Sequence, residues 1–510
     1  MSVLRDYCPT CEMMNELHNS HSHVILSFTM FIPCLPQRSR ALSQHLPKEC
    51  LDGIFINFQD DKDTLFNCLF VCRHWCYAAV EILWRRPFSP HFRPNPVGTW
   101  EPDYIKQSEK RSRLIEVYIA CLGLTEEWRS MNLQIEHSKS LFFNYVALLK
   151  EFHLQGLYNS VRDWVDYRQF AKIMRDNEAC KDRPKIRSLM KRLIAGESSK
   201  KTFRVPSVCT DFSVVEKIVP FLCRKILNHS QALRVLSLDI DRFSRCLELY
   251  EEVQHHIPLE SLTKITSFEW TVNSPAASTF AKLAETTQNL KTVKIWRLTT
   301  YWSKHAGKVM VDTPQLVRLI RSQKRILHFE LGWTVIPWND VLEALNHHSN
   351  TLQTIRLKSV TFRWWRNDFA LTSCPNLEKI YITSCGLLTE ENFRPLMTAI
   401  FPKLKEMVFT QTNVPSTIIE ALLINCGRTL QRLDFGSSLN FELLLVRAMA
   451  ECHEIRDFTW YPSCHHNLFI EFLGQQGQLK TIRITDRGAW DSSPLLNHCT
   501  LRRLNVYYIK

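Results

Sequence analysis

The stretch 404–435, LKEMVFTQTNVPSTIIEALLINCGRTLQRLDF, decides the fold of this 510-residue chain. It opens and closes on one pattern: an apolar residue, two free positions, an apolar residue, one free position and an apolar residue. The two copies are Leu404-Met407-Phe409 and Leu430-Leu433-Phe435. The last two residues of each copy are two apart, so they share one face of a short strand. After Pro415, apolar residues recur at three- and four-residue steps, which predicts a helix over 415–426.

The same triplet recurs throughout the second half of the chain. Its other copies start at Leu233, Ile265, Leu290, Ile326, Leu352, Leu377, Ile455, Leu479 and Leu501. Most starts lie about 22 to 27 residues apart, a period typical of leucine-rich repeats. One such strand cannot bury its apolar face alone, so neighbouring strands stack into a parallel sheet. The sequence therefore predicts an α/β leucine-rich-repeat solenoid over 233–510, a horseshoe with the parallel sheet on its concave side.

The chain before these repeats is predicted to fall into four parts. Residues 1–45 are expected to form a disordered tail and 46–88 a small helical module. Residues 89–135 are expected to be a linker, marked by prolines up to 112, and a helical connection. Residues 136–232 start the repeat array, with a possible strand at 149–154, and carry a helical, basic insertion. Within that insertion, 181–204 has nine Lys or Arg and two acids, over half of the net charge of +13.

The module at 46–88 is apolar at helical spacing. Its first helix is predicted from Leu51, Ile54, Phe55 and Phe58, and its second begins after a turn formed by Asp60, Asp61 and Asp63. Gly53, inside the first helix, costs about 1 kcal/mol relative to Ala. About 43 residues is close to the lower limit for independent folding, so such a module plausibly leaves a face for a partner.

Three motifs in this module carry a resemblance. They are Leu46-Pro47-x-Glu49-x-Leu51-x-x-Ile54-Phe55, Cys68-Leu69-x-Val71-Cys72-Arg73-x-Trp75 and Leu83-Trp84-Arg85. Together they resemble an F-box, and the chain as a whole resembles the F-box/leucine-rich-repeat proteins. The resemblance implies a substrate-recognition subunit of a Skp–cullin–F-box ubiquitin ligase, with no catalysis in this chain. By position, the residues implied to contact the Skp linker are Leu46, Pro47, Leu51, Ile54, Phe55, Leu69, Val71 and Trp75, although most of them could instead pack the three helices.

A protein substrate is expected on the concave face of the repeats, where the free residues beside the apolar pairs point. The aromatic and basic candidates are Trp296, Arg356, Lys358, Tyr381, Arg432, Tyr461 and Arg483. Acidic residues are mixed among them, which argues against a nucleic-acid groove. The position after the first triplet residue is often basic, as at Lys291, Lys405 and Lys480. We call these basic positions the rim row, because stacked repeats would align them along the edge of the sheet. In one interpretation they keep the protein soluble; in the other they attract an acidic or phosphorylated substrate.

Several functions are excluded by motif. Among 13 glycines, none has the spacing of a dinucleotide loop, a phosphate loop or a nucleophile elbow, so we expect no cofactor. Cys8-Pro-Thr-Cys11 is half of a zinc pattern without a second pair, so we expect no metal. The 18 cysteines are scattered among apolar residues, which suits reduced thiols in the cytoplasm or nucleus. No stretch is long and apolar enough for a membrane span.

Two alternatives to the ligase subunit remain open from the residues alone. In the first, the repeats form a protein-interaction scaffold without a ubiquitin link, and the helical module only caps the solenoid. In the second, the chain binds nucleic acid through 181–204, with an affinity that falls steeply with salt.

Overall fold

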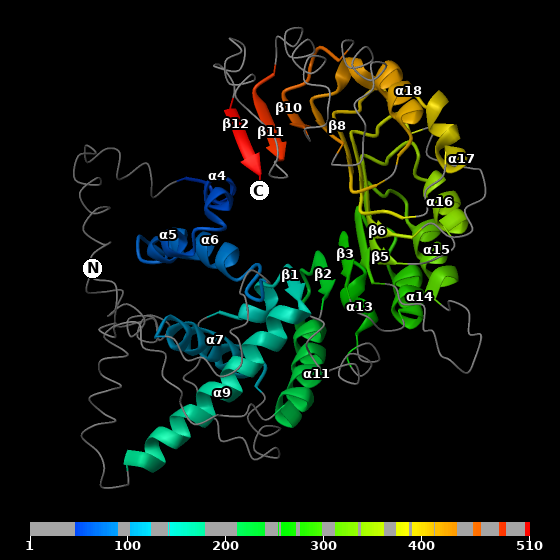
Figure 1. Cartoon of the computed structure of the whole chain (residues 1–510). Coiled ribbons are helices and arrows are strands. Elements are labelled where there is room, and N and C mark those ends of the chain that lie inside the picture. Colours follow the sequence, from blue (N-terminus) through cyan, green and yellow to red (C-terminus); the bar gives the residue numbers. More distant parts are fainter. Residues whose placement is uncertain are drawn as a thin grey trace. The chain divides into compact units, whose positions relative to one another are not determined.

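The computed structural model describes residues 46–89, 102–123, 141, 143–178, 212–239, 253, 257–271, 276–297, 312–334, 338–361, 374–386, 390–412, 414–435, 452–460, 479–485 and 505–509. The chain divides into two compact units. Figure 1 labels their helices and strands in sequence colours. The first unit contains residues 1–237 and 248–261, and the second 238–247 and 262–510. The predicted tail at 1–45 and the basic segment at 181–204 lie outside the described residues. No described helix has the length and apolar character that crossing a bilayer requires.

The first unit begins with the N-terminal helical module, residues 46–89. It consists of α4 (Lys48–Phe55), the 3-10 turn η2 (Ile56–Phe58), α5 (Lys62–Cys68) and α6 (Arg73–Leu83). Pro47 caps the start of α4, because a residue there needs no free N–H. Asp61 caps α5 by accepting a hydrogen bond from the Thr64 N–H at 3.0 Å. The predicted three helices and their acidic turn are thus present.

The rest of the first unit is built from long helices around a short parallel strand pair. It contains α7 (Pro102–Cys121), η3 (Tyr145–Leu148), β1 (Glu151–His153), α9 (Leu154–Glu178), α11 (Phe212–His229) and β2 (Val235–Leu238). Strand β1 pairs in parallel with β2, with Phe152 opposite Leu236. The expectation that 89–112 is a linker is wrong from Pro102 onward. A proline fits the first turn of a helix, so Pro102 can begin α7.

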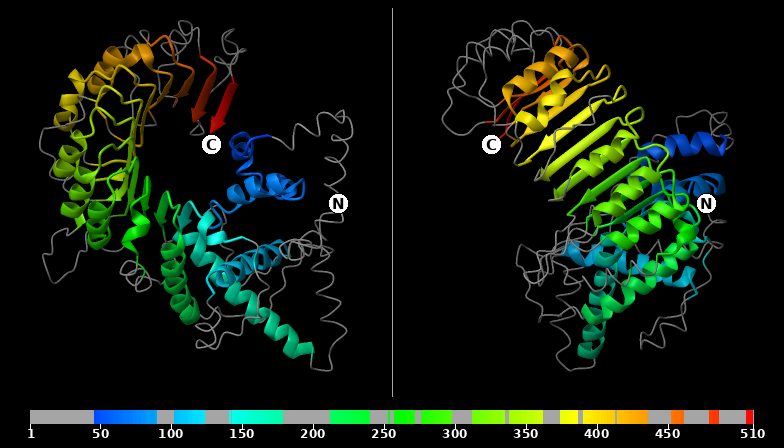
Figure 2. Two further views of the ribbon diagram at one scale, coloured as in Figure 1. Left: turned by 180° about the vertical axis from the view of Figure 1, so that it is seen from behind. Right: turned by 90° about the vertical axis from the view of Figure 1, so that its right-hand side faces the viewer.

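The second unit is a parallel sheet with helices on one face (Figures 1 and 2). Its strands are β3 (Ser267–Trp270), β4 (Thr292–Trp296), β5 (His328–Thr334), β6 (Thr354–Val360), β7 (Lys379–Thr383), β8 (Glu406–Thr410), β9 (Arg432–Asp434), β10 (Asp457–Trp460), β11 (Thr481–Thr485) and β12 (Asn505–Ile509). Each strand pairs with the next one along the chain. Its described connecting helices are α14 (Ala277–Thr286), α15 (Asp312–Ser322), α16 (Trp338–Asn346), α17 (Glu390–Phe393) with η5 (Arg394–Thr398), and α18 (Ser416–Cys426) with η6 (Gly427–Thr429). The short α13 (Leu259–Leu262) comes before β3 and lies mostly in the first unit. This repeated strand–helix order is consistent with a solenoid.

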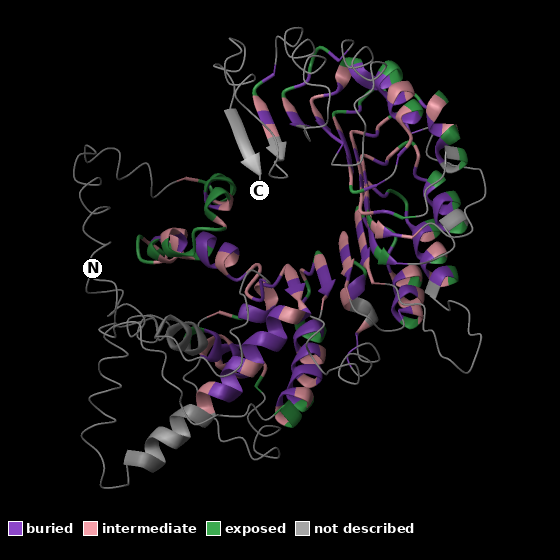
Figure 3. Cartoon of the chain, viewed as in Figure 1, coloured by how far each residue is buried: buried purple, intermediate pink, exposed green. Residues whose placement is uncertain are grey.

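The apolar triplets form the core (Figure 3). Every described triplet residue from Leu233 to Ile482 is buried, including the first residue of each triplet, which lies just before its strand. The predicted helix at 415–426 is present as α18, whose Ile418, Leu422 and Cys426 are buried. Tyr461 and the triplet at 501–506 fall outside the residues whose side chains are described.

A shared carbonyl links successive repeats. Two neighbouring N–H groups at the start of one repeat donate to a single carbonyl of the repeat before it. The Lys405 carbonyl, for example, accepts from Gln431 N at 2.8 Å and Arg432 N at 2.9 Å. The same arrangement recurs at the carbonyls of Thr266, Lys291, Leu327, Gln353, Glu378, Gln431 and Arg456. The ladder satisfies backbone groups that the short strands would otherwise leave unpaired.

A left-handed residue recurs at or near the ends of five strands. Five non-glycine residues have φ between 50° and 61°: Arg297, Trp333, Ser359, Ser384 and Gln411. Each follows a residue of one register row, Trp296–Gly332–Lys358–Thr383–Thr410. A left-handed conformation costs an L-residue roughly 1–2 kcal/mol. The position therefore redirects the chain in the same way in five successive repeats.

Candidate protein-binding surfaces

The core of the helical module explains which apolar residues are available to a partner. Leu51 and Phe55 are 0% and 2% exposed and pack with Leu65, Ala78 and Ile82. Trp75 lies against this core, with its ring 5.2 Å from that of Phe55 in an edge-on arrangement. Leu46 and Leu69 are likewise partly buried against it.

The sequence expectation is therefore corrected for Leu51 and Phe55. They are four residues apart on α4, so both face the module's interior instead of a partner. Ile54 and Val71, by contrast, are 44% and 49% exposed, and Pro47 is exposed too. The structure adds exposed apolar side chains that the motif reading missed, namely Phe58, Phe70 and Tyr77. Ile54 and Phe58 are four residues apart in the sequence. This helical spacing was the signal from which a second, exposed apolar stripe beside Leu51 and Phe55 could have been predicted.

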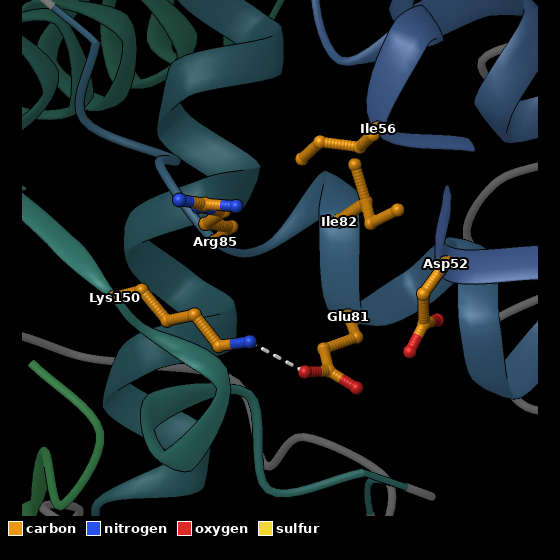
Figure 4. A pocket seen from close by; sticks show the side chains of 6 residues that line it. All are labelled: Asp52, Ile56, Glu81, Ile82, Arg85 and Lys150. Carbon is orange, nitrogen blue, oxygen red and sulfur yellow. Dashed lines mark hydrogen bonds and ion pairs between the residues drawn. The ribbon is translucent and has the colours of Figure 1, made fainter. Parts of the chain in front are cut away.

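Charged groups fix the module to the first strand of its unit. Glu81 on α6 accepts a hydrogen bond from Lys48 Nζ at 2.7 Å. It accepts a second one from Lys150 Nζ at 2.6 Å, which Figure 4 shows. Burial raises the pKa of Glu81, but the two lysine hydrogen bonds outweigh it and hold that pKa below its ordinary value. Glu81 and Lys150 line a pocket of about 260 Å³ together with Asp52, Ile56, Ile82 and Arg85. The carboxylate therefore bridges α4 and the residue that precedes β1.

Aromatic packing and one glycine complete this attachment. The Trp84 ring lies 4.1 Å from that of Tyr145, and the Phe88 ring lies 5.0 Å from that of Tyr118. Gly156, in the first turn of α9, rests on the Phe88 backbone: a Cβ at this position would come 1.9 Å from the Phe88 carbonyl oxygen. Only glycine allows so close an approach.

The end of the module also joins the shared-carbonyl ladder. The Arg85 carbonyl accepts from Lys150 N at 3.0 Å and Glu151 N at 2.9 Å. The Lys150 carbonyl in turn accepts from Arg234 N at 2.7 Å and Val235 N at 3.0 Å. The Arg85 carbonyl thus accepts the same pair of backbone hydrogen bonds from the start of β1 that a carbonyl of each repeat accepts from the next repeat. The module is therefore joined by backbone hydrogen bonds to the edge of the β1–β2 pair.

The comparisons with known proteins bear on this module. Residues 43–90 match the F-box-like family model. The matched residues contain the whole of the module's described part, 46–89, so the chain carries an F-box-like domain at this place. F-box domains in general link substrate adaptors to ubiquitin ligases. No curated protein matches the chain as a relative.

The second surface is the open face of the sheet, which we define as the face opposite α14 to α18. The structure places Trp296, Arg356, Lys358, Tyr381, Arg432 and Arg483 on its strands, at positions that alternate with the buried triplet residues. Lys358 is exposed and the other five are partly buried. Asp434, on β9 between the triplet residues Leu433 and Phe435, is buried.

The open face brings several of these candidates together in pairs. The Lys358 ammonium lies 5.4 Å from the Trp296 ring centroid, and the Arg356 guanidinium 4.4 Å from that of Tyr381. Arg356 Nη1 is also 3.6 Å from Glu330 Oε2. Burial raises the pKa of Glu330 above its ordinary value, against the opposing influence of Arg356 and Lys294.

A second group on the open face centres on Glu406. Its carboxylate accepts hydrogen bonds from Lys379 Nζ at 2.6 Å and from the Tyr381 hydroxyl, and Arg432 Nη1 lies 3.7 Å away. Burial raises the pKa of Glu406, but these partners outweigh it and the pKa lies below its ordinary value. Two cations thus share one carboxylate at this point.

The rim row lies at the start of the strands. Its described members, Arg234, Lys291, Lys405, Arg456 and Lys480, are all exposed. Lys405 pairs with Glu378 at 3.1 Å and Arg456 with Glu454 at 3.9 Å. Exposed pairs of this kind contribute little to stability. The row is therefore a solvated edge that remains accessible to other molecules.

Two observations concern metal binding and cysteine reactivity among the described residues. No group of three or more His, Cys, Asp or Glu among them could hold a metal ion. Burial raises the pKa of the Cys68 and Cys385 thiols to about 11 and that of Cys374 to about 12, which disfavours the nucleophilic thiolate. Cys8 and Cys11 lie outside the described residues.

Proposed function

We propose that this protein is a substrate-recognition adaptor of a Skp–cullin–F-box ubiquitin ligase, without catalysis of its own. The observation that carries the proposal is the F-box-like match at 43–90, which falls on a helical module with exposed apolar side chains. Apolar side chains that remain exposed on a small module are typical of a protein-binding surface. In this role the protein acts in the cytoplasm or nucleus.

The two surfaces have separate tasks in this proposal. The F-box binds the Skp linker through Pro47, Ile54 and Val71, with Phe58 and Phe70 beside them in the sequence. The parallel sheet belongs to leucine-rich repeats and binds a protein substrate on its open face. Two sets of hydrogen bonds support a fixed place for the F-box. The Arg85 carbonyl accepts from the backbone N–H groups of Lys150 and Glu151, and the Glu81 carboxylate accepts from Lys150 Nζ. Together they hold the F-box at a fixed position relative to β1.

A binding experiment with purified Skp linker tests the proposal. We expect the full chain to bind, and the double variant I54E/V71E to lose most of that binding because it places two charges on the apolar surface. I424E is the matched control, since Ile424 on α18 is 59% exposed and lies outside the F-box. Equal binding by I54E/V71E and the intact chain would refute the assignment of this surface.

A scaffold without a ubiquitin link is the second candidate. One observation favours it: the Arg85 carbonyl closes the edge of β1 in the manner of a capping repeat. The I54E/V71E variant separates the two functions, because it alters the exposed surface and leaves the cap intact. Retained cellular function of this variant would favour the scaffold, and loss of substrate ubiquitination would favour the adaptor.

A further inference from the structure

The open face carries an aromatic platform at the ends of β4, β5 and β6. Trp296, Gly332 and Lys358 are neighbours in one register row. A Cβ on Gly332 would come 2.9 Å from Trp296 Cε3 and 3.1 Å from Cδ2, so the indole ring lies across the glycine. Lys358, opposite Gly332 on β6, places its ammonium 5.4 Å from the centroid of this ring. The absence of a side chain at position 332 therefore makes the platform possible.

Cations exceed carboxylates around this platform. Arg356 and Lys358 are two residues apart on β6, so both lie on the open face about 6.6 Å apart along the strand. Glu330 is the acidic neighbour, but its side chain is only 13% exposed and already lies 3.6 Å from Arg356. Among the described residues, Lys358 forms no ion pair with a carboxylate, and its ammonium lies 5.4 Å from the centroid of the Trp296 ring.

We propose that this platform binds an extended acidic segment of a partner protein, with carboxylates on alternate residues. In an extended chain, alternate side chains have the same spacing as Arg356 and Lys358, so two carboxylates of a Glu-x-Glu segment reach both cations at once. The intervening residue or its backbone packs on the Trp296 indole. The acidic segment would belong to a ubiquitination substrate, and this part of the proposal rests on the function proposed above.

The test uses fluorescein-labelled peptides of alternating Glu and Gly, of Gln and Gly, and of phosphoserine and Gly, with fluorescence anisotropy of the full chain. We expect the Glu peptide to bind at least about tenfold more tightly than the Gln peptide. K358E should weaken Glu-peptide binding by at least about tenfold. K324E, which makes the same charge change at an exposed lysine between α15 and β5, should change it by less than about twofold.

G332A probes the platform without altering any charge. Its added methyl group displaces the Trp296 ring, so we expect weaker binding of the Glu peptide with the same far-ultraviolet circular dichroism as the intact chain. Equal binding of the Glu and Gln peptides, binding of the phosphoserine peptide alone, or equal effects of K358E and K324E would overturn the proposal. No Skp or cullin subunit is present in this assay, so its failure leaves the ligase test unaffected.

Discussion

Gly156 is the position where the attachment of the F-box can be tested most sharply. In Gly156→Ala the new Cβ would lie 1.9 Å from the Phe88 carbonyl oxygen and 2.5 Å from its carbon. An ordinary C···O contact is about 3.3 Å, so α9 and the Phe88 backbone must separate by about 1.4 Å. Both sides are firmly packed, because Phe88, Leu154 and Leu157 are buried and the clashing atoms are backbone.

The expected cost follows from two opposing contributions. Overpacking costs about 1–3 kcal/mol, occasionally more, whereas Ala gains up to about 1 kcal/mol over Gly in a helix. Gly53→Ala is the matched control, because Gly53 is exposed in α4 and a Cβ there meets nothing within 4 Å. We therefore expect Gly156→Ala to be about 2 kcal/mol or more less stable than Gly53→Ala.

Amide hydrogen exchange in the full chain measures this difference locally. A loss of about 2 kcal/mol in local opening accelerates exchange about thirtyfold, and peptides covering 80–88 and 150–160 should show it. In Gly53→Ala, exchange across 48–55 should be unchanged or slower. If Gly156→Ala exchanges like the intact chain, the close packing of α9 on Phe88 and the fixed attachment derived from it are incorrect.

Three further predictions concern charged and titratable side chains that are buried or half-buried. Arg111 and Asp163 form a buried ion pair between α7 and α9. Arg111→Met leaves the Asp163 charge buried and unpaired, so it should lower the free energy of unfolding of the first unit by about 3–5 kcal/mol in urea titrations. Adding Asp163→Leu removes that charge and should recover part of the loss. Glu81→Gln should weaken the attachment of α4 to Lys150; exchange across 48–55 should accelerate, and an unchanged rate would show that the bridge is dispensable. Burial lowers the pKa of His348, with His347 adding to the effect, while its Nε2 donates to the Ile320 carbonyl at 2.9 Å. This group therefore contributes full stability above its unfolded pKa of about 6.5 and loses it as the pH falls below that value, so His348→Gln should flatten the slope of melting temperature against pH there.

The repeat fold was largely predictable because one physical rule governs it. Each triplet fixes which residues of a strand are buried, and the described triplets follow that rule from Leu233 to Ile482. The shared-carbonyl ladder was not predictable, since it is made by backbone groups that carry no sequence signal. The helix from Pro102 was missed because a proline that begins a helix and a proline in a linker look alike in the sequence.

The candidate sites were predictable only in part. The motif identified the F-box, but helical spacing alone did not show that Leu51 and Phe55 turn inward while Ile54 and Val71 remain exposed. On the open face, Trp296 and Lys358 were both expected to bind a partner. Their contact across Gly332 depends on the register of three strands, which the sequence of any one strand does not contain.

The most direct test of the central claim is the binding of purified Skp linker to the full chain, measured beside its I54E/V71E and I424E variants. We expect the intact chain and I424E to bind, and I54E/V71E to lose binding. Absence of binding by the intact, folded chain, or equal binding by all three, would contradict the claim that this protein is an F-box adaptor.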